Sequence, residues 1–234
     1  MPKQHVLSDL RAVFFDVDGT LVDSIEMCVL GLGDTYERFV GFRPNDAEIK
    51  SMIGIPLYRQ LARYDEVEPT REEMERRIAF TIERYAVHES RQREFFPAVQ
   101  ALEWCHHQGF KTALVTSKNA EELERFLNHF SWTNLVDTTV CASDVRFPKP
   151  HPESLRLACE RLDLSPPEVA MVGDSVYDLR CARDAGAYAI GVAYGAASYE
   201  VLKAEEPDHV LNTPEALLEW VQSQQLAKSC VERT

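Results

Sequence analysis

The most constraining feature of this sequence is an apolar run that ends abruptly in two carboxylates. Residues 12–15 are apolar, and residues 16–20 read Asp-x-Asp-Gly-Thr. A buried strand rarely tolerates charge in its interior, so we expect Asp16 and Asp18 just beyond the carboxyl end of a strand. Parallel sheets place their ligand sites at that edge. Taken alone, the segment is also compatible with a loop that carries two surface aspartates.

Three later segments place polar or charged residues after an apolar run or in a proline-rich loop. They are Thr116-Ser117 after residues 111–115, Lys149 in the loop 147–152, and Asp174 with Asp178 after residues 169–173. If the strands are parallel, the connections that follow them share one edge of the sheet, and the four motifs converge there.

The sequence after about residue 97 alternates between helix and strand patterns. We expect helices from about residues 97, 119, 151 and 177, and strands near 111, 137, 169 and 188. Gly109 and Gly186 follow two of these helices and are suited to a left-handed helix end. The alternation predicts an α/β fold with a doubly wound, Rossmann-like parallel sheet.

Almost a hundred residues separate the first two motifs, far more than one crossover helix requires. Residues 24–93 have mostly helical patterns, and Thr70 precedes an acidic first turn as an N-cap does. We therefore expect a catalytic core of residues 1–23 and 94–234, with residues 24–93 inserted as a small helical cap. The cap would hinge over Asp16. A rigid subdomain that never moves is the alternative.

Composition and charge limit the classes of partner. The chain has 234 residues, of which 45% are hydrophobic, which suits one core with a modest insertion. The formal charge of −13 argues against broad contact with nucleic acid or an anionic membrane. No apolar run reaches the roughly 18 residues that span a bilayer, and the N-terminus lacks a secretion pattern. We expect a cytoplasmic protein with reduced cysteines, since none of its six cysteines forms Cys-x-x-Cys.

Taken in order, the four motifs closely resemble those of the haloacid dehalogenase superfamily of phosphohydrolases. The resemblance runs from about residue 11 to about 220, and matches the insertion only in general character. Within that superfamily, the chain looks most like the phosphoglycolate-phosphatase-type enzymes with a helical, C1-type cap. The helical insertion, residues 53–57 and residues 191–198 carry this closer likeness, although related pyrophosphatases and nucleotidases share much of the pattern.

The residue types suggest a reaction at phosphorus. A carboxylate can attack phosphorus and form an acyl-phosphate, and we expect Asp16 to be this nucleophile. Two anions need a cation between them, and carboxylate oxygens suit Mg²⁺. Asp174 is the expected second carboxylate on the metal. The resemblance implies that the backbone carbonyl of Asp18 is a further ligand, while Asp178 ligates directly or holds a metal-bound water.

Further side chains would act on the phosphoryl group. Asp18 looks like the general acid and base, and Lys149 would supply fixed positive charge. The expected hydrogen-bond donors to phosphate are Gly19, Thr20, Thr116 and Ser117. Each role has a rival: Thr116 and Ser117 could cap a helix, Lys149 could be a solvated loop lysine, and Asp178 could neutralise a helix N-terminus.

The expected activity is Mg²⁺-dependent hydrolysis of a small phosphorylated metabolite. In the cap, Arg59 or Arg63 could pair with a substrate carboxylate or second phosphate, but surface arginines on helices are common. Asp18 argues against the dehalogenase and phosphonatase branches, and Thr20 favours hydrolysis over sugar phosphomutase chemistry. The alternatives are a pyrophosphatase, a phosphomutase, or a catalytically idle regulator that binds a phosphometabolite.

Overall fold

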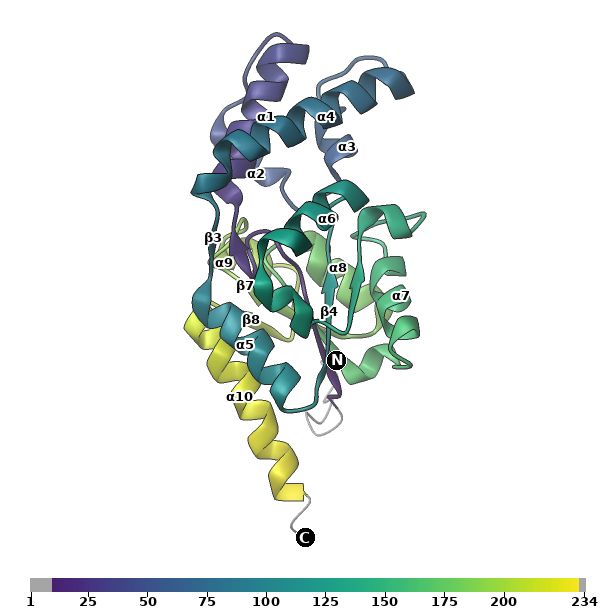
Figure 1. Cartoon of the computed structure of the whole chain (residues 1–234). Coiled ribbons are helices and arrows are strands. Elements are labelled where there is room, and N and C mark those ends of the chain that lie inside the picture. The colour runs from purple at the N-terminus through teal and green to yellow at the C-terminus, as the bar shows by residue number, and fades with distance from the viewer. Residues whose placement is uncertain (1–9, 232–234) are drawn as a thin grey trace.

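A six-stranded, all-parallel sheet forms the centre of the protein (Figure 1). The computed structural model describes the backbone of residues 10–231 and the side chains of residues 10–224. The strand order is β5-β4-β1-β6-β7-β8. The strands are β1 (Ala12–Phe15), β4 (Lys111–Val115), β5 (Thr138–Val140), β6 (Val169–Gly173), β7 (Tyr188–Val192) and β8 (His209–Leu211).

Helices cover both faces of this sheet. Those of the core are α5 (Phe96–His107), α6 (Ala120–His129), α7 (Glu153–Arg161), α8 (Val176–Ala185), α9 (Tyr199–Lys203) and α10 (Pro214–Val231). Short 3₁₀ turns are η3 (Ser131–Leu135), η4 (Ala142–Asp144) and η5 (Pro166–Glu168). Residues of α5, α6 and α10 pack in one hydrophobic cluster, and residues of α7, α8 and α9 pack in another. The predicted doubly wound α/β fold is confirmed.

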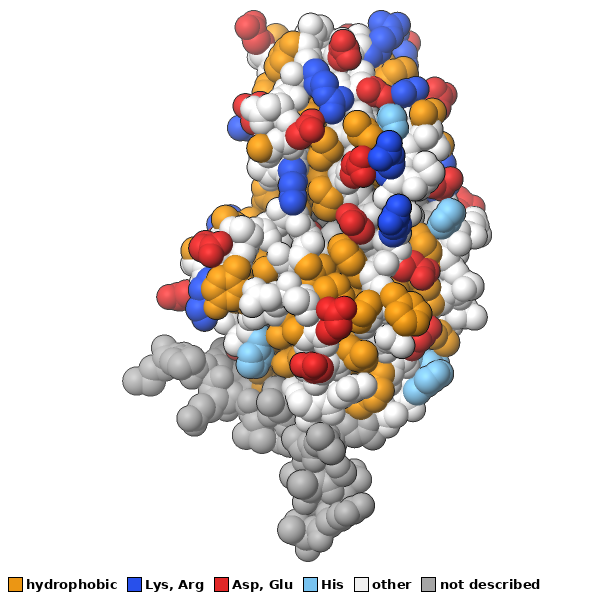
Figure 2. Space-filling model, turned by 90° about the vertical axis from the view of Figure 1, so that its left-hand side faces the viewer, with side chains coloured by type: hydrophobic (Ala, Val, Ile, Leu, Met, Phe, Trp, Pro, Cys, Tyr) orange, Lys and Arg blue, Asp and Glu red, His pale blue; other side chains and the backbone are white. Residues whose placement is uncertain are grey.

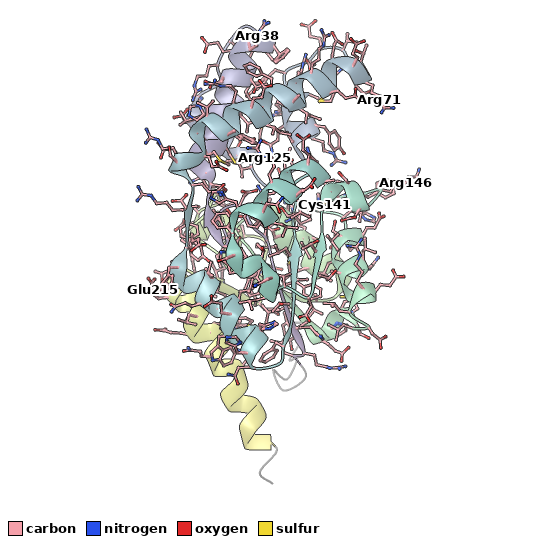
Figure 3. The ribbon with its side chains drawn as sticks, in the orientation of Figure 1. Arg38, Arg71, Arg125, Cys141, Arg146 and Glu215 are labelled. Atoms are coloured by element: carbon pink, nitrogen blue, oxygen red, sulfur yellow. The ribbon has the colours of Figure 1, made fainter. Side chains whose placement is uncertain are left out.

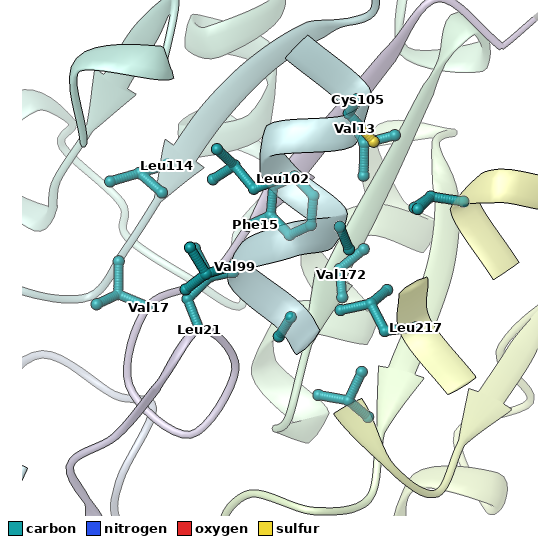
Figure 4. Packing of buried hydrophobic residues seen from close by; sticks show 14 of the residues in the cluster. Val13, Phe15, Val17, Leu21, Val99, Leu102, Cys105, Leu114, Val172 and Leu217 are labelled. Carbon is teal, nitrogen blue, oxygen red and sulfur yellow. The ribbon is translucent and has the colours of Figure 1, made fainter. Parts of the chain in front are cut away.

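The first strand contributes to both clusters because successive side chains of a strand point to opposite faces. Val13 and Phe15 pack with residues of α5 and α10, as Figure 4 shows, whereas Ala12 and Phe14 belong to the cluster on the other face. All four are buried. This explains why residues 12–15 form a continuous apolar run rather than an alternating one.

The strand order places the first motif at a topological switch point. β1 pairs with β4 on one side and with β6 on the other. Phe15, the last residue of β1, lies opposite Leu114 and Val172. The loops after these three strands therefore leave the same edge of the sheet side by side, which is where ligands bind in open α/β sheets.

An all-helical insertion lies above this edge (Figure 1). It contains α1 (Ile25–Phe39), α2 (Asp46–Ser51), α3 (Leu57–Leu61), α4 (Arg71–His88) and the turn η2 (Glu89–Arg91). Its two ends form a short antiparallel pair, β2 (Val22–Asp23) and β3 (Arg93–Glu94). The insertion has a hydrophobic cluster of its own that includes Leu32, Tyr36 and Leu61. On the face shown in Figure 2, acidic and basic side chains are interspersed over its surface.

Local signals agree with most of the expected boundaries. Thr70 caps α4 in a capping box with Glu73, and Gly186 ends α8 at φ 91° in the left-handed region. The alternation of strands and helices extends further along the chain than predicted, through β8 and α10. The sequence signal of β8 is weak because this strand has only three residues and is incompletely buried. Among the described residues, no helix has both the length and the apolar character needed to cross a membrane. Five cysteines are buried free thiols, and the side chain of Cys230 lies outside the described residues.

The buried position of Phe14 predicts a large loss of stability on truncation. The side chain of Phe14, a residue of β1, is fully buried in the cluster that includes residues of α7 and α8. Phe14→Ala should therefore lower the free energy of unfolding by about 3–5 kcal/mol in urea denaturation. Val67→Ala is the control, because Val67 is 81% exposed and its truncation should change stability by less than about 0.5 kcal/mol. Equal effects of the two substitutions would contradict this packing.

Candidate active site

Three carboxylates converge at the edge of the sheet where β1 and β6 end. Asp16 directly follows β1, Asp174 directly follows β6, and Asp178 lies in the first turn of α8. One oxygen from each lies within 4.8 Å of one from each of the others, and all three side chains are buried. The sequence predicted this convergence from the order of the motifs, the expected parallel sheet and the resemblance to a known family.

Lys149 is the cation buried among these carboxylates. Its Nζ lies 3.0 Å from Asp16 Oδ1 and 2.6 Å from Asp178 Oδ1, and donates to the backbone oxygen of Val115 at 2.9 Å. The side chain has no exposed surface. Lys149 is therefore a fixed charge of the site and not a solvated loop lysine. Burial opposes its charge, but Asp16 and Asp178 outweigh that effect and raise the pKa of its ammonium.

The cluster carries more negative than positive charge. Burial, opposed by Lys149 and reinforced by Asp178 and Asp18, raises the pKa of Asp16 to about 7. Burial and the charges of Asp16 and Asp178 also raise the pKa of Asp174 well above its ordinary value. Three carboxylates facing one ammonium thus lack a counter-charge, and their oxygens are the donors that hard divalent cations prefer. The residues present fit a divalent metal, held by Asp16, Asp174 and Asp178.

Two glycines make room for Asp174. Gly19 has φ +76°, and a Cβ at this position would lie 1.9 Å from Asp174 Oδ2. A Cβ at Gly195 would lie 2.3 Å from the same oxygen. The amide of Ala196 donates to this oxygen. The glycine of the first motif is therefore required both by its backbone conformation and by the space that the carboxylate occupies.

Asp178 caps α8, as one of its two expected roles requires, and it also contacts Lys149. Its Oδ2 accepts hydrogen bonds from the amide and the hydroxyl of Ser175, at 3.1 and 2.6 Å, in the capping box that begins α8. Its Oδ1 binds Lys149. The side chain thus caps a helix and belongs to the carboxylate cluster at the same time.

Asp18 has hydrogen-bond and ion-pair partners of its own outside the three-carboxylate cluster. Ser24 Oγ donates to Asp18 Oδ1 at 2.6 Å, and Lys118 Nζ lies 2.6 Å from Asp18 Oδ2. Burial disfavours the charge of Lys118, but Asp18 and Glu122 raise the pKa of its ammonium. Sequence reasoning missed Lys118 and Ser24. The signal for Lys118 was its place directly after Thr116-Ser117, at the carboxyl edge of β4.

The hydroxyls expected near phosphate have different surroundings. Thr116 Oγ1 accepts from the amide of Lys118 at 3.2 Å, and Ser117 Oγ donates to the backbone oxygen of Gly54 at 2.7 Å. Gly54 belongs to the insertion, so Ser117 links the core to it. Thr20 is fully buried, and its Oγ1 has no hydrogen-bond partner among the described atoms.

A small recess of about 30 Å³ lies between the core and the insertion. Its core side includes Asp16, Asp18 and the residues 116–118, and its insertion side is largely apolar. Neither Arg59 nor Arg63 is among its lining residues, and Arg59 Nε instead donates to Tyr58 Oη. The same short helix, α3, lines the recess through other residues, Leu57 and Gln60.

Comparison with known proteins identifies the family. Residues 13–192 match the family described as haloacid dehalogenase-like hydrolase. Pyrophosphatase PpaX from Bacillus velezensis is 30% identical over 209 residues, which make up 89% of this chain and 95% of that relative. The chain belongs to the haloacid dehalogenase-like hydrolase family.

Solved structures share the fold along almost the whole chain. A structure described as a predicted phosphoglycolate phosphatase from Haemophilus somnus superimposes with a TM-score of 0.75 at 22% identity, covering 92% of this chain and 99% of that one. The structure of CbbY from Rhodobacter sphaeroides in complex with phosphate gives a TM-score of 0.74 at 20% identity, with coverage of 90% and 99%. At these identities the likeness concerns the fold alone.

Because a Cβ at position 19 would collide with the Asp174 carboxylate, we expect Gly19→Ala to abolish divalent metal binding. A methyl group there would displace the Asp174 carboxylate, so Mg²⁺ should no longer raise the melting temperature of the variant. Gly109→Ala is the matched control, because Gly109 also has a positive φ, +82°, but has nothing within 4 Å of a Cβ. The positive φ should cost each variant about 1 kcal/mol of stability, and Gly19→Ala should lose more because its methyl group also displaces Asp174. Only Gly109→Ala should keep the response to Mg²⁺. A full response in Gly19→Ala would contradict this geometry.

The raised carboxyl pKa values predict how stability depends on pH. The folded protein holds protons on Asp16 and Asp174 more tightly than the unfolded chain does. The metal-free protein should therefore lose the stability contributed by these groups as the pH rises from about 4 to about 7. Because a metal replaces those protons, Mg²⁺ should raise the melting temperature more at pH 8 than at pH 5. An equal or larger effect at pH 5 would refute this account.

Proposed function

We propose that this protein is a Mg²⁺-dependent phosphatase that hydrolyses a small phosphomonoester through an aspartyl-phosphate on Asp16. The observation that carries the proposal is the pairing of Asp16 with the buried Lys149 in a carboxylate cluster that fits a divalent metal. Asp16 also lines the recess between the core and the insertion. Related proteins named as pyrophosphatase or phosphoglycolate phosphatase support the choice of phosphorus chemistry.

Each residue of the site has a role in the proposed reaction. Asp16, Asp174, Asp178 and the backbone carbonyl of Asp18 would hold Mg²⁺, which, when bound, offsets the repulsion between carboxylate and phosphate. An oxygen of Asp16 attacks phosphorus, and the bond from phosphorus to the leaving oxygen breaks. Lys149 keeps the Asp16 carboxylate oriented and provides positive charge beside the phosphoryl oxygens.

Asp18 would transfer the protons. It protonates the leaving oxygen in the first half of the reaction, and in the second half it removes a proton from the water that hydrolyses the aspartyl-phosphate. In this structure Asp18 binds Lys118 and Ser24. For catalysis its side chain must therefore exchange these partners for the substrate.

We further propose that residues 24–93 act as a cap on a catalytic core of residues 1–23 and 94–234. The cap is joined through the short β2–β3 pair, and Gly54 of the cap accepts a hydrogen bond from Ser117 of the core. A substrate bound in the recess would be enclosed by both parts, which favours a compact phosphorylated metabolite. Gly19, Thr20 and Thr116 would bind the phosphoryl oxygens.

Pyrophosphate is the second candidate substrate, since the relatives named pyrophosphatase PpaX include one that is 30% identical. A phosphomutase is less favoured, because Thr20 occupies the position where that branch usually has a bulkier aliphatic residue. The idle phosphate-binding regulator is also less favoured, since Asp16, Asp18 and Lys149 are all present.

The first experiment tests the proposed role of Asp16 as the nucleophile. Asp16→Asn should lower the rate of phosphate release from a panel of small phosphomonoesters and pyrophosphate by about a thousand-fold or more, because the neutral amide is a poor nucleophile. Chelation of Mg²⁺ should abolish release by the native chain.

The matched control is Asp184→Asn, which removes the same charge from an exposed position on α8. This variant should keep the native rate. Phosphate release by folded Asp16→Asn at the native rate, or release by the native chain that is insensitive to chelation, would refute the proposed function.

A further inference from the structure

Both carboxylate oxygens of Asp18, the proposed general acid and base, already have a partner. Ser24 Oγ donates to Oδ1 at 2.6 Å, and Lys118 Nζ lies 2.6 Å from Oδ2. Ser24 is fully buried at the start of the insertion, so this contact is fixed by the fold. A substrate that takes Lys118 away from Asp18 would therefore free one oxygen for the proton transfers of the proposed reaction.

Lys118 depends on Asp18 for its charge balance. Its side chain is only 10% exposed, and within residues 10–224 Asp18 provides the only carboxylate oxygen within 4.0 Å of its Nζ. The nearby Glu122 uses its Oε2 to accept a hydrogen bond from the amide of Asn119 at 2.8 Å, in the capping box of α6. A largely buried ammonium that loses its partner is strongly disfavoured. Asp18 can therefore leave Lys118 at low cost only if another anion replaces it.

A ligand in the recess can reach Lys118. The side chain lines this recess together with Asp16 and Asp18, and it also borders a second recess of about 60 Å³ beside α6. It keeps some exposed surface, whereas Lys149 has none. A ligand that lies beside Asp18 is thus also beside the ammonium of Lys118.

Other cations do not compete with Lys118 for an anion at this place. Of the described residues that line the recess, Lys118 is the only cationic one. Lys149 is already bound by two carboxylates, and Arg125 lines the second recess but not this one. Figure 3 shows Arg38 and Arg71 at the end of the insertion that is farthest from the core.

We propose that Lys118 determines substrate specificity by pairing with an anionic group of the leaving group, which replaces Asp18 as its partner and frees Asp18 to act on the leaving oxygen. This inference rests on the proposed function and deepens it. Because Lys118 and Asp18 are in direct contact, the anionic group must lie next to the leaving oxygen. The substrate class is the phosphate ester of a short 2-hydroxy acid. No covalent step is involved beyond the phosphoryl transfer described above.

The exchange explains why a neutral leaving group would be a poor substrate. When a substrate carboxylate replaces the Asp18 carboxylate, Lys118 stays paired throughout the reaction. With an alkyl leaving group, Asp18 can reach the leaving oxygen only by abandoning a largely buried ammonium. Sites with a buried polar group that needs a substrate partner discriminate strongly against analogues that lack this partner.

The test compares two phosphate esters of similar size. In 2-phosphoglycolate the leaving group carries a carboxylate, and ethyl phosphate has a methyl group in its place. The native chain should hydrolyse 2-phosphoglycolate with a kcat/KM about ten-fold or more above that of ethyl phosphate. In Lys118→Met, a substitution of similar length without charge, kcat/KM for 2-phosphoglycolate should fall about ten-fold or more. The value for ethyl phosphate should stay the same or rise, because Lys118 no longer holds Asp18.

Lys111→Met is the matched control. Lys111 also forms an ion pair with an aspartate, Asp137, at 2.8 Å, but it lies at the opposite end of β4 and is 51% exposed. This variant should keep the native rates on both esters, and Lys118→Arg, which keeps the charge, should keep the preference for 2-phosphoglycolate. If Lys118→Met does not fold, Lys118→Gln, which is uncharged but retains a donor for Asp18, should show the same loss of preference.

The outcomes separate this inference from the proposed function. A native chain without the preference, a preference that survives in the folded, uncharged variant, or an equal loss of activity on both esters would overturn the role of Lys118 and leave a phosphatase. Hydrolysis of other phosphomonoesters of the panel but of neither test ester would do the same. Failure of the native, folded, Mg²⁺-loaded chain to release phosphate from any compound would overturn both.

Discussion

The ion cluster around Lys149 is the interaction on which the site depends. An ammonium without solvent contact is tolerated only where carboxylates and hydrogen-bond acceptors surround it, and Asp16, Asp178 and the Val115 carbonyl do this. These partners come from the ends of β1 and β4 and from the start of α8. The cluster is therefore possible only when β1 lies between β4 and β6. The excess of three carboxylates over one ammonium makes the site suited to a divalent cation.

The two parts of the chain contribute differently to the proposed chemistry. The core supplies the charged groups, held by rigid backbone at the carboxyl ends of buried strands, and Gly19 makes space for Asp174. The insertion supplies a mostly apolar wall that also contains Gln60 and Tyr85. In the proposed reaction the charged groups of the carboxylate cluster would act on any phosphoryl group, so the choice of substrate would fall to Lys118 and to the wall that faces the leaving group. Ser117 connects the two parts through its hydrogen bond to Gly54.

The predictions made from sequence were most accurate where residue type and periodicity agreed. The parallel sheet followed from apolar runs alternating with helix signals, and the convergence of Asp16, Lys149, Asp174 and Asp178 followed from motif order together with the resemblance to a known family. The insertion was harder to interpret. Arg59 drew attention because it is charged, yet it lies on the exposed side of α3 beside Tyr58. Gln60 carried no signal, because an uncharged polar residue on a short helix is normally found in contact with solvent.

The sequence by itself determined the fold class, the identity of the charged groups and their place after strands, because buried strands and helices leave strong periodic patterns. Only the tertiary structure decided which partners those groups have. Asp18 binds Lys118 and Ser24, Asp178 contacts both Ser175 and Lys149, and Gln60 rather than Arg59 lines the recess. The physical reason is that a side-chain contact depends on the orientation of elements far apart in the chain, and periodicity within one element carries no information about that orientation.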